Sequence, residues 1–354
     1  MKRVLVAGAG VAAVECVLAL RELARPAVEV ELLAPAGELV YRPASVTTPF
    51  GAEAAPRIDL SGLGVRHRHD ALAEVSPATH EVLTRDGERV AYDQLVVATG
   101  AHSRDAVANA VTFRGPLSAG AMESVLARAT ADAELRVVFA APAGATWPLP
   151  VYELALLSAA ALRERGVADP DLTVVTAEER PLAALGAEAS EALLAVLDGA
   201  GVDVVTGVAA AATEGALRLR DGRVVGADVV VALPVVVGPR IAGLPHDADG
   251  FLATDEHGRV RGCEDVFAAG DATAFPIKHG SLAAAQADAI AETIAGVADP
   301  APFHPVLQGM LLTGADPLYI RAELGVAATV TTEPLWSPPA KIVGRYLTPF
   351  LAAV

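Results

Sequence analysis

Residues 265–287 read DVFAAGDATAFPIKHGSLAAAQA and hold the side chains with the clearest chemical use in this chain. Gly270 lets the backbone approach a ligand closely, and the carboxylate of Asp271 can accept hydrogen bonds from hydroxyl groups. A helix is expected to open at Gly280-Ser281, where free N–H groups and a partial positive charge favour an electron-rich ligand. The pattern predicts a site for a cofactor that carries both a phosphate and a polyol.

A second glycine turn near the N-terminus has the form Gly8-x-Gly10-x-x-Ala13. An apolar strand over residues 4–7 runs into this turn, and a helix that contains Ala12 follows it. Gly8 permits the tight turn, Gly10 lets the backbone touch a pyrophosphate, and Ala13 allows the helix to pack closely on the strand. This order predicts a dinucleotide-binding fold, whereas an Ala/Gly-rich turn without a ligand is the alternative.

The acidic residue that usually binds the adenosine ribose is missing from its expected place. It normally follows the second strand, here residues 28–33, roughly twenty residues after the glycine turn. This chain has Ala34-Pro35 at that position, with Glu31 inside the strand and Glu38 just after it. Either glutamate could substitute, so the sequence leaves the ribose contact open.

The composition of the 354 residues excludes several classes of function. A formal charge of −16 argues against nucleic-acid backbones and against binding to anionic lipid by charge alone. Alanine supplies much of the 53% hydrophobic fraction and aromatic residues are only 4%, as in α/β folds built on parallel sheets. The basic cluster at residues 66–69 is expected to lie in a solvated polar loop.

Two cysteines, Cys16 and Cys263, cannot build a disulfide scaffold, and no CxxC motif occurs. We expect both to be small buried or semi-buried residues without redox activity, which fits a cytoplasmic setting. The N-terminal MKR precedes a core strand, so no cleavable signal is expected. The longest apolar run, residues 224–237, is interrupted and too short to span a bilayer. No pattern of metal ligands is identified.

Strands and helices alternate in the order of an α/β protein with two fused Rossmann-like, three-layer domains and parallel sheets. A strand in the first domain ends in Ala98-Thr99-Gly100, and Thr99 and Gly100 are expected to support the loop against the cofactor. A β-hairpin is expected at residues 81–89. The predicted elements of the second domain are strands over 135–140, 172–177, 202–206 and 229–233, helices over 151–165 and 190–199, and a hairpin at 221–222. The first domain would comprise residues 1–112 and 244–300, the second 113–243, and a C-terminal segment 301–354.

These motifs resemble those of the FAD-dependent pyridine nucleotide–disulfide oxidoreductase superfamily. GxGxxA at the start, ATG near residue 100 and FAAGDA near residue 270 stand in the superfamily's order, over about residues 1–300. Within the superfamily, the chain looks similar to the sulfide:quinone oxidoreductase-like and type II NADH dehydrogenase-like branch. The resemblance implies FAD bound across the first domain, with the flavin near Tyr41-Arg42-Pro43 and the helix that opens at Gly280. The residues implied to bind FAD are Gly8, Gly10, Ala12, Ala13, Arg42, Pro43, Thr99, Gly100, Gly270, Asp271, Gly280, Ser281 and Leu282.

Two departures from the family pattern concern the second domain. Residues 139–150 read FAAPAGATWPLP, so a Pro-rich turn replaces the GxGxxG of nicotinamide-binding relatives and removes N–H donors that a pyrophosphate would use. For sulfide oxidation, the resemblance implies paired reactive cysteines, one of them near this turn. Trp147 stands about there instead, and neither cysteine matches a catalytic position, which argues against sulfide oxidation.

Lys278 and His279 are the candidate catalytic residues, because they precede the helix that would face the flavin. One of them could reach the flavin N1/O2 edge and stabilise reduced flavin or relay protons, and the alternative is a solvated pair on a loop. Trp147 and Trp336 either wall the substrate pocket or pack between elements. Glu153 is expected on the surface of an amphipathic helix, with a contact to a nicotinamide ribose as the alternative.

A terminal amphipathic helix is predicted over residues 340–351, because apolar side chains recur there at three- and four-residue spacing. Such a helix packs on its own domain or docks on a membrane surface. The strong negative charge of the chain favours packing on its own domain.

We therefore expect an FAD-dependent oxidoreductase that passes electrons from a reduced donor through the flavin to a small or quinone-like acceptor, without a redox-active disulfide. Its partners would be a small-molecule donor and acceptor, and no nucleic acid. The first alternative is a type II NAD(P)H dehydrogenase-like enzyme, so NAD(P)H stays a candidate second cofactor. The second is a non-catalytic FAD-binding redox sensor or partner subunit. Donor, acceptor, pathway and oligomeric state, a homodimer included, are left open.

Overall fold

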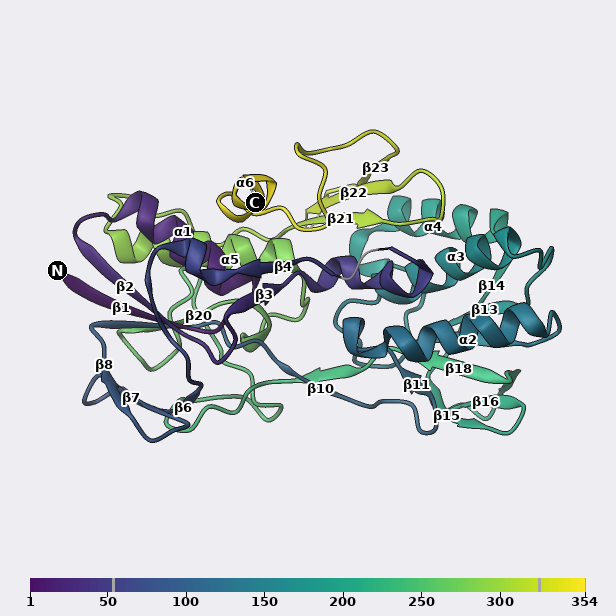
Figure 1. Ribbon diagram of the computed structural model, residues 1–354, viewed down its shortest axis with the longest axis horizontal. Coiled ribbons are helices and arrows are strands. Elements are labelled where there is room, and N and C mark those ends of the chain that lie inside the picture. Colours follow the sequence, from purple (N-terminus) through teal and green to yellow (C-terminus); the bar gives the residue numbers. More distant parts are fainter. Residues whose placement is uncertain (53–54, 324–325, 354) are drawn as a thin grey trace.

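The computed structural model describes residues 1–52, 55–323 and 326–353 (Figure 1). Its first part is built on a five-stranded parallel sheet in the order β20-β9-β1-β2-β5. The strands are β1 (Lys2–Ala7), β2 (Val28–Leu33), β5 (Arg66–Arg68), β9 (Gln94–Val97) and β20 (Val266–Ala268). Because β20 pairs with β9, the chain returns to its first sheet after it has built the second one.

Alternate residues of β1 point to opposite faces of this sheet, as strand geometry requires. Val4 and Val6 pack under the helices α1 (Val11–Leu23) and α5 (Gly280–Ala295), whereas Leu5 and Ala7 pack on the other face. That face is covered by an antiparallel sheet of β6 (Leu72–Ser76), β7 (Glu81–Thr84) and β8 (Arg89–Ala91), which contains the predicted hairpin at 81–89. The parallel sheet is thereby covered on both faces, in three layers.

A second five-stranded parallel sheet has the order β11-β18-β12-β13-β14. Its strands are β11 (Val111–Thr112), β12 (Val137–Ala141), β13 (Leu172–Thr176), β14 (Val202–Thr206) and β18 (Val229–Ala232). One face is covered by α2 (Ala119–Ala131), α3 (Leu149–Glu164) and α4 (Ala187–Gly199), and the other by the antiparallel strands β15 (Ala209–Thr213), β16 (Ala216–Leu219) and β17 (Val224–Gly226). The predicted fold class is confirmed, while the domain boundaries stay a prediction.

Short elements join the two sheets and close the molecule. Between the sheets runs an antiparallel ribbon of β10 (His102–Arg104) and β19 (Val235–Val237) (Figure 1). The C-terminal part contributes the antiparallel strands β21 (Val306–Leu311), β22 (Leu318–Glu323) and β23 (Thr329–Thr331), and then α6 (Leu347–Ala353). The remaining elements are the β3 (Glu38–Val40) and β4 (Arg57–Asp59) pair and 3₁₀ helices over Arg42–Val46, Thr48–Phe50, Leu60–Leu63, Gly115–Ser118, Ala183–Leu185 and Gly270–Ala272.

The terminal helix is shorter than the prediction over 340–351, because it begins only at Leu347. Side chains from distant parts of the chain bind the N–H groups that precede it. The N–H of Ile342 donates to the Tyr41 hydroxyl at 3.0 Å. The N–H of Val343 donates to Ser281 Oγ at 2.8 Å. These bonds hold the segment in a non-helical path against the first domain. In the described part of the chain, no helix has the length and apolarity to cross a bilayer.

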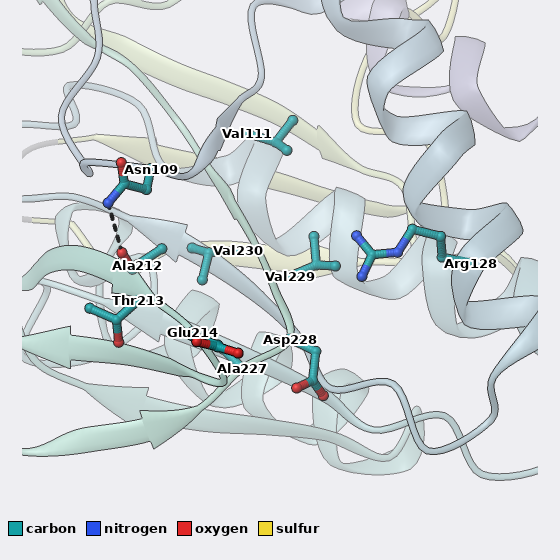
Figure 2. A pocket seen from close by; sticks show the side chains of 10 residues that line it. All are labelled: Asn109, Val111, Arg128, Ala212, Thr213, Glu214, Ala227, Asp228, Val229 and Val230. Atoms are coloured by element: carbon teal, nitrogen blue, oxygen red, sulfur yellow. Dashed lines mark hydrogen bonds between the residues drawn. The ribbon is translucent and has the colours of Figure 1, made fainter.

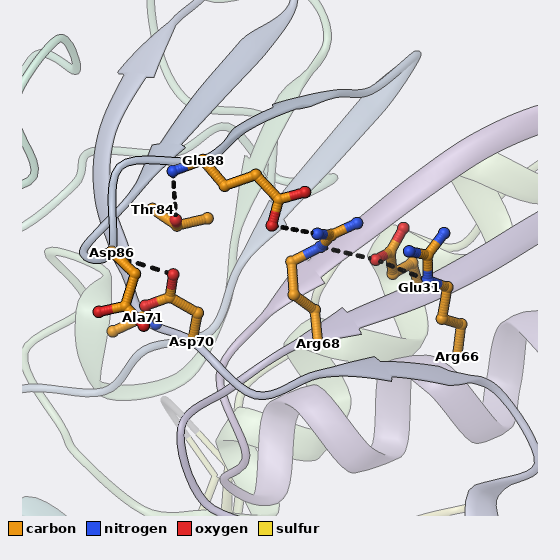
Figure 3. A network of polar contacts seen from close by, with 8 residues as sticks. All are labelled: Glu31, Arg66, Arg68, Asp70, Ala71, Thr84, Asp86 and Glu88. Carbon is orange, nitrogen blue, oxygen red and sulfur yellow. Dashed lines mark hydrogen bonds and ion pairs between the residues drawn. The ribbon is translucent and has the colours of Figure 1, made fainter.

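The predicted polar loop at residues 66–69 is also wrong, because residues 66–68 form the edge strand β5. Its arginines are accommodated by ion pairs (Figure 3). Arg68 donates to Glu31 of β2 at 2.8 Å and to Glu88 as well, and Arg66 lies 3.4 Å from Glu31. The basic residues are thus partly neutralised within the sheet.

Candidate functional site

Two glycines fix the turn after β1. Gly8 has a φ of +130°, and a Cβ there would lie 2.1 Å from the carbonyl oxygen of Ala98, so the turn accommodates only glycine. A Cβ at Gly10 would meet nothing within 4 Å. Gly10 is also the N-cap of α1, and among the described residues no side chain caps the first turn of that helix. The open space beside an uncapped helix N-terminus suits a pyrophosphate.

The Gly270-Asp271 turn packs directly onto this helix. A Cβ at Gly270 would lie 3.2 Å from the Cβ of Ala12 and 3.4 Å from the Cβ of Ala283, so the turn lies between α1 and α5. The N–H of Gly270 donates to Oε1 of Gln286 at 2.7 Å. The two glycine motifs, far apart in the sequence, therefore lie side by side in the fold.

Asp271 is half-buried, and none of the described protein groups donates a hydrogen bond to its carboxylate. Burial raises the pKa of Asp271, while the positive charges of Lys278 and Arg42 lower it. A carboxylate with free acceptor positions can bind the hydroxyl groups of a ribityl chain.

The other predicted cofactor residues lie at the same edge of the first sheet. Thr99 and Gly100 follow β9, just as the Gly8 turn follows β1 and the Gly270 turn follows β20. The carboxyl ends of parallel strands meet at one edge, where α/β proteins bind their ligands. The exposed Arg42, with Pro43, begins the first 3₁₀ helix. The positive charge of Arg42 is one of the two that lower the pKa of Asp271.

His279 occupies the N-cap of α5. Its Nδ1 accepts a hydrogen bond from the N–H of Ser281 at 3.3 Å, and its ring packs on Trp147 with 4.5 Å between ring centroids. Burial, with a contribution from Lys341, lowers the pKa of His279 to about 4. The imidazole is therefore neutral near pH 7, and because Nδ1 accepts, Nε2 carries the proton.

Lys278 is held by the loop that leads into α5. Its Nζ donates to the carbonyl oxygens of Thr273 and, at 2.8 Å, Phe275, and it lies 4.0 Å from the centroid of the Phe251 ring. Burial lowers the pKa of Lys278 to about 8, although Asp271 opposes the shift. These contacts support the loop, and a role of Lys278 toward the flavin stays a prediction.

The prediction that Glu153 lies on the surface is wrong. Its side chain is 1% exposed, and both carboxylate oxygens contact Nζ of Lys341, at 2.6 and 2.7 Å. Oε1 also accepts the N–H of Leu312 at 2.9 Å. Because α3 is apolar all round, burial of this glutamate could have been inferred from the sequence, whereas Lys341 carried no such signal. The pair ties α3 to the C-terminal segment beside His279.

The Pro-rich turn of the second domain is followed by a helix that begins at Leu149, with Pro148 as its N-cap and no side-chain cap. A second proline, Pro150, lies in the first turn and also lacks an N–H group. Glu178 follows β13, at the position from which an acid would bind a nicotinamide dinucleotide's ribose. It instead accepts hydrogen bonds from the hydroxyls of Tyr152 and Thr176.

Both cysteines are free and buried. Cys16 packs with the core between the first sheet and its helices, and Cys263 packs on the opposite face of that sheet. A disulfide between them would require their Cα atoms to lie within about 7 Å, which the intervening sheet prevents. Burial raises the thiol pKa of both residues, so neither has the thiolate character of a reactive cysteine.

Two cavities are found in the described chain, and the second is lined by Leu282, one of the residues implied to bind FAD. One of about 300 Å³ lies at the amino end of β18, and its charged lining residues are Arg128, Glu214 and Asp228 (Figure 2). The other, about 190 Å³, is mainly apolar and is lined by Phe275 and Leu282 among others. Neither of these cavities is lined by a tryptophan.

The two candidate pocket tryptophans have different surroundings. Trp147 packs against His279 at the N-terminus of α5. Trp336 donates from Nε1 to the carbonyl oxygen of Ala340 at 2.9 Å and packs edge-on against Tyr319. Trp147 therefore lies beside the candidate site, whereas Trp336 packs within the C-terminal segment. A role for either one toward a substrate stays a prediction.

The fold and the paired glycine turns are those of a flavin-dependent oxidoreductase. The model of the pyridine nucleotide-disulphide oxidoreductase family matches residues 2–138 and 153–289, and the chain belongs to this family. The matched ranges leave out residues 139–152, which contain the Pro-rich turn and Trp147. The family is one of flavin-dependent oxidoreduction, which agrees with the expectation from the sequence motifs.

Solved structures share the fold at low sequence identity. The sulfide:quinone oxidoreductase of the hyperthermophilic bacterium Aquifex aeolicus superposes with a TM-score of 0.84 and 19% identity, over 94% of this chain and 87% of that one. A ferredoxin reductase from Rhodopseudomonas palustris gives a TM-score of 0.69 and 23% identity, over 90% and 82%. An NAD-dependent persulfide reductase from A. fulgidus gives 0.67 and 18%, over 90% and 64%. At these identities the likeness establishes the fold alone.

The residues present fit FAD. The open space at Gly10 can take a pyrophosphate, and the unpartnered carboxylate of Asp271 can take hydroxyl groups. The N-terminus of α5 offers a partial positive charge to the electron-rich edge of a flavin ring. All three features lie at one edge of the first sheet.

Proposed function

We propose that this chain is an FAD-dependent oxidoreductase that passes electrons from a reduced donor to a small or quinone-like acceptor without a redox-active disulfide. One observation carries the proposal. The side chains that pack at the N-terminus of α5 are a neutral imidazole and an indole, His279 and Trp147, and both cysteines are free and buried with raised thiol pKa values. Bound FAD would supply the electron transfer, and the protein would supply position and electrostatics.

His279 is the residue that we propose to act on the flavin or its substrate. Because Nδ1 is engaged with the N–H of Ser281, the imidazole presents Nε2–H as a hydrogen-bond donor of fixed orientation. It is neutral at physiological pH, so it donates a hydrogen bond without adding a positive charge. A donor at the flavin edge would stabilise the electron-rich reduced ring and raise its potential.

Two features of the second domain weigh against nicotinamide as the donor. Pro148 and Pro150 remove N–H groups at the start of α3, where a pyrophosphate would need them. Glu178, in the place of a ribose-binding acid, is engaged by Tyr152 and Thr176. We therefore propose that the electron donor is a compound other than NAD(P)H.

The test of the proposal is an anaerobic absorbance titration of the flavin-loaded protein. We expect no bleaching with stoichiometric NADH or NADPH, ready reduction by dithionite, and rapid reoxidation of the reduced protein by a short-chain ubiquinone analogue. Stoichiometric bleaching by either nicotinamide would instead assign the chain to the NAD(P)H dehydrogenase-like alternative. Protein that takes up no FAD would refute the proposal entirely.

His279→Ala and His279→Asn separate the two roles of this residue. Asparagine is a good N-cap, so His279→Asn keeps the cap of α5 and removes the imidazole. We expect both variants to lower the flavin midpoint potential, and His279→Ala to lower stability by about 1 kcal/mol more than His279→Asn, because both lose the packing on Trp147 but only alanine loses the cap. An exposed control, His304→Ala, should change neither quantity. Unchanged potentials in both variants would reduce His279 to a structural cap.

A further inference from the structure

The ribose contact that the sequence leaves open has a candidate at the edge of the first sheet. Ala34 and Pro35 follow β2, and neither side chain can hydrogen-bond a ribose hydroxyl. The turn of Gly8 lies directly beside this position, because its N–H donates to the carbonyl oxygen of Leu33 at 2.9 Å. A dinucleotide whose pyrophosphate lies at Gly10 would therefore extend its adenosine over the end of β2.

The neighbouring strand β5 ends at the same edge, because it runs parallel to β2. The N–H of Ala34 donates to the carbonyl oxygen of Arg68 at 3.1 Å. His69 is the next residue, so it lies next to the position from which the missing acid would act. His69, at the end of β5, thus lies beside the position after β2 where the ribose-binding acid is missing.

The carboxylates near this edge are already engaged. Glu31 is paired with the arginines of β5 (Figure 3). Glu38 is paired with Arg57 at 3.1 Å. Asp70 accepts the N–H of Ala71 at 2.6 Å and that of Asp86 at 3.2 Å. These three acids therefore have partners that a ribose would have to displace.

The imidazole of His69 is exposed and is positioned by its neighbours. Its ring packs on that of His67 with 3.9 Å between centroids, and His67 is itself anchored through Nε2 to the carbonyl oxygen of Ala34 at 2.9 Å. A Cβ at Gly37 would lie 3.7 Å from Cε1 of His69, so the ring lies over the loop that follows β2. Across the described residues, no protein group hydrogen-bonds the His69 side chain.

We propose that His69 takes the place of the missing acid and binds the ribose hydroxyls of the adenosine half of FAD. A neutral imidazole has one donor and one acceptor nitrogen, and a ribose hydroxyl can pair with either. The inference rests on the proposed function only in that FAD is the bound dinucleotide. His69 is not required for electron transfer, and its effect is on cofactor affinity.

The test is fluorescence titration of the apoprotein with FAD and with the FAD analogue that carries 2′-deoxyadenosine. Wild-type protein is expected to bind FAD about tenfold more tightly than the analogue, as for the loss of one hydrogen bond. His69→Ala should weaken FAD binding about tenfold and bind both dinucleotides equally. His69→Gln, which keeps a donor and an acceptor, should recover part of the discrimination.

Two comparisons keep the result specific. His304→Ala, on the C-terminal part, should bind like the wild type, and urea unfolding of each apoprotein shows whether a variant is folded. Glu31→Gln is expected to retain the discrimination. If Glu31→Gln binds both dinucleotides equally while His69→Ala still prefers FAD, the ribose contact belongs to Glu31 and the inference is overturned. Wild-type protein that binds no FAD would instead refute the proposed function, so the two failures are distinguishable.

Discussion

Replacement of Lys341 by methionine should expose how strongly the C-terminal segment is held. The ammonium of Lys341 is the only cation among the groups that contact the carboxylate of Glu153 in the described residues, and the side chains are 12% and 1% exposed. The same carboxylate accepts the N–H of Leu312. Lys341→Met leaves a buried carboxylate with one backbone donor, in a position that water cannot reach freely.

The expected loss of stability is about 3–5 kcal/mol, the usual cost of removing one partner from a buried ion pair. It should depend on pH. Burial raises the pKa of Glu153 and Lys341 opposes that shift, so removal of the lysine raises it further. The folded variant then binds a proton that the unfolded chain releases above about pH 4.3. Stability must therefore fall as pH rises toward the folded-state pKa, by up to about 1.4 kcal/mol per pH unit.

The assay is urea unfolding of the flavin-loaded protein at pH 6, 7 and 8. Glu153→Gln combined with Lys341→Met should recover stability relative to Lys341→Met and remove the added pH slope. Arg57→Met, which breaks a pair whose side chains are 64% and 49% exposed, is the matched control and should cost less than about 1 kcal/mol. The reasoning would be refuted if Lys341→Met lost no more stability than this control and if its stability depended on pH as that of the wild type does.

Three further predictions concern the first domain. Burial and the neighbouring Glu15 raise the pKa of Asp288 to about 8, so stability should fall as pH rises from about 4 to 8, and Asp288→Asn should flatten that decline in thermal midpoints. Gly8→Ala forces a Cβ to 2.1 Å from the Ala98 carbonyl oxygen at a φ of +130°, so it should cost at least about 2 kcal/mol and abolish FAD retention, measured as flavin per purified chain. Cys263→Ser should leave donor-dependent turnover unchanged, and a large loss would contradict the proposed absence of cysteine chemistry.

The parts of the fold that the sequence predicted are those set by local rules. The glycine turn of residues 8–13 can be recognised from the sequence, because its backbone conformation and its close approach to a ligand and to the neighbouring strand require residues without bulky side chains. The helix Val11–Leu23 follows the glycine turn as predicted, and the strand Val28–Leu33 follows from the apolar pattern and has the predicted bounds. The pairing of hairpins such as that at residues 81–89 follows from turn residues between alternating segments.

The parts that the sequence did not predict depend on contacts between distant residues. The terminal helix is shortened because the N–H groups of Tyr346 and Leu347 donate to Glu15, more than 300 positions earlier, at 2.8 and 2.6 Å. Helical periodicity cannot reveal such an acceptor. In the same way, Lys341 looks like a surface lysine until the fold brings it to Glu153. A charged residue in an apolar segment indicates burial, but the sequence does not reveal which residue it pairs with.

The start of α3 gives a physical reason why the second domain departs from the family pattern. In a nicotinamide-binding unit, the turn and first residues of this helix face a dinucleotide. Here Tyr152 donates to Glu178, and Glu153 binds Lys341. Both side chains are committed to the protein itself, and Trp147 from the same turn packs on His279. A dinucleotide that used these side chains would have to break their present contacts and would find fewer N–H donors in return. This arrangement supports the proposal that the electron donor is not a nicotinamide dinucleotide bound by the second domain.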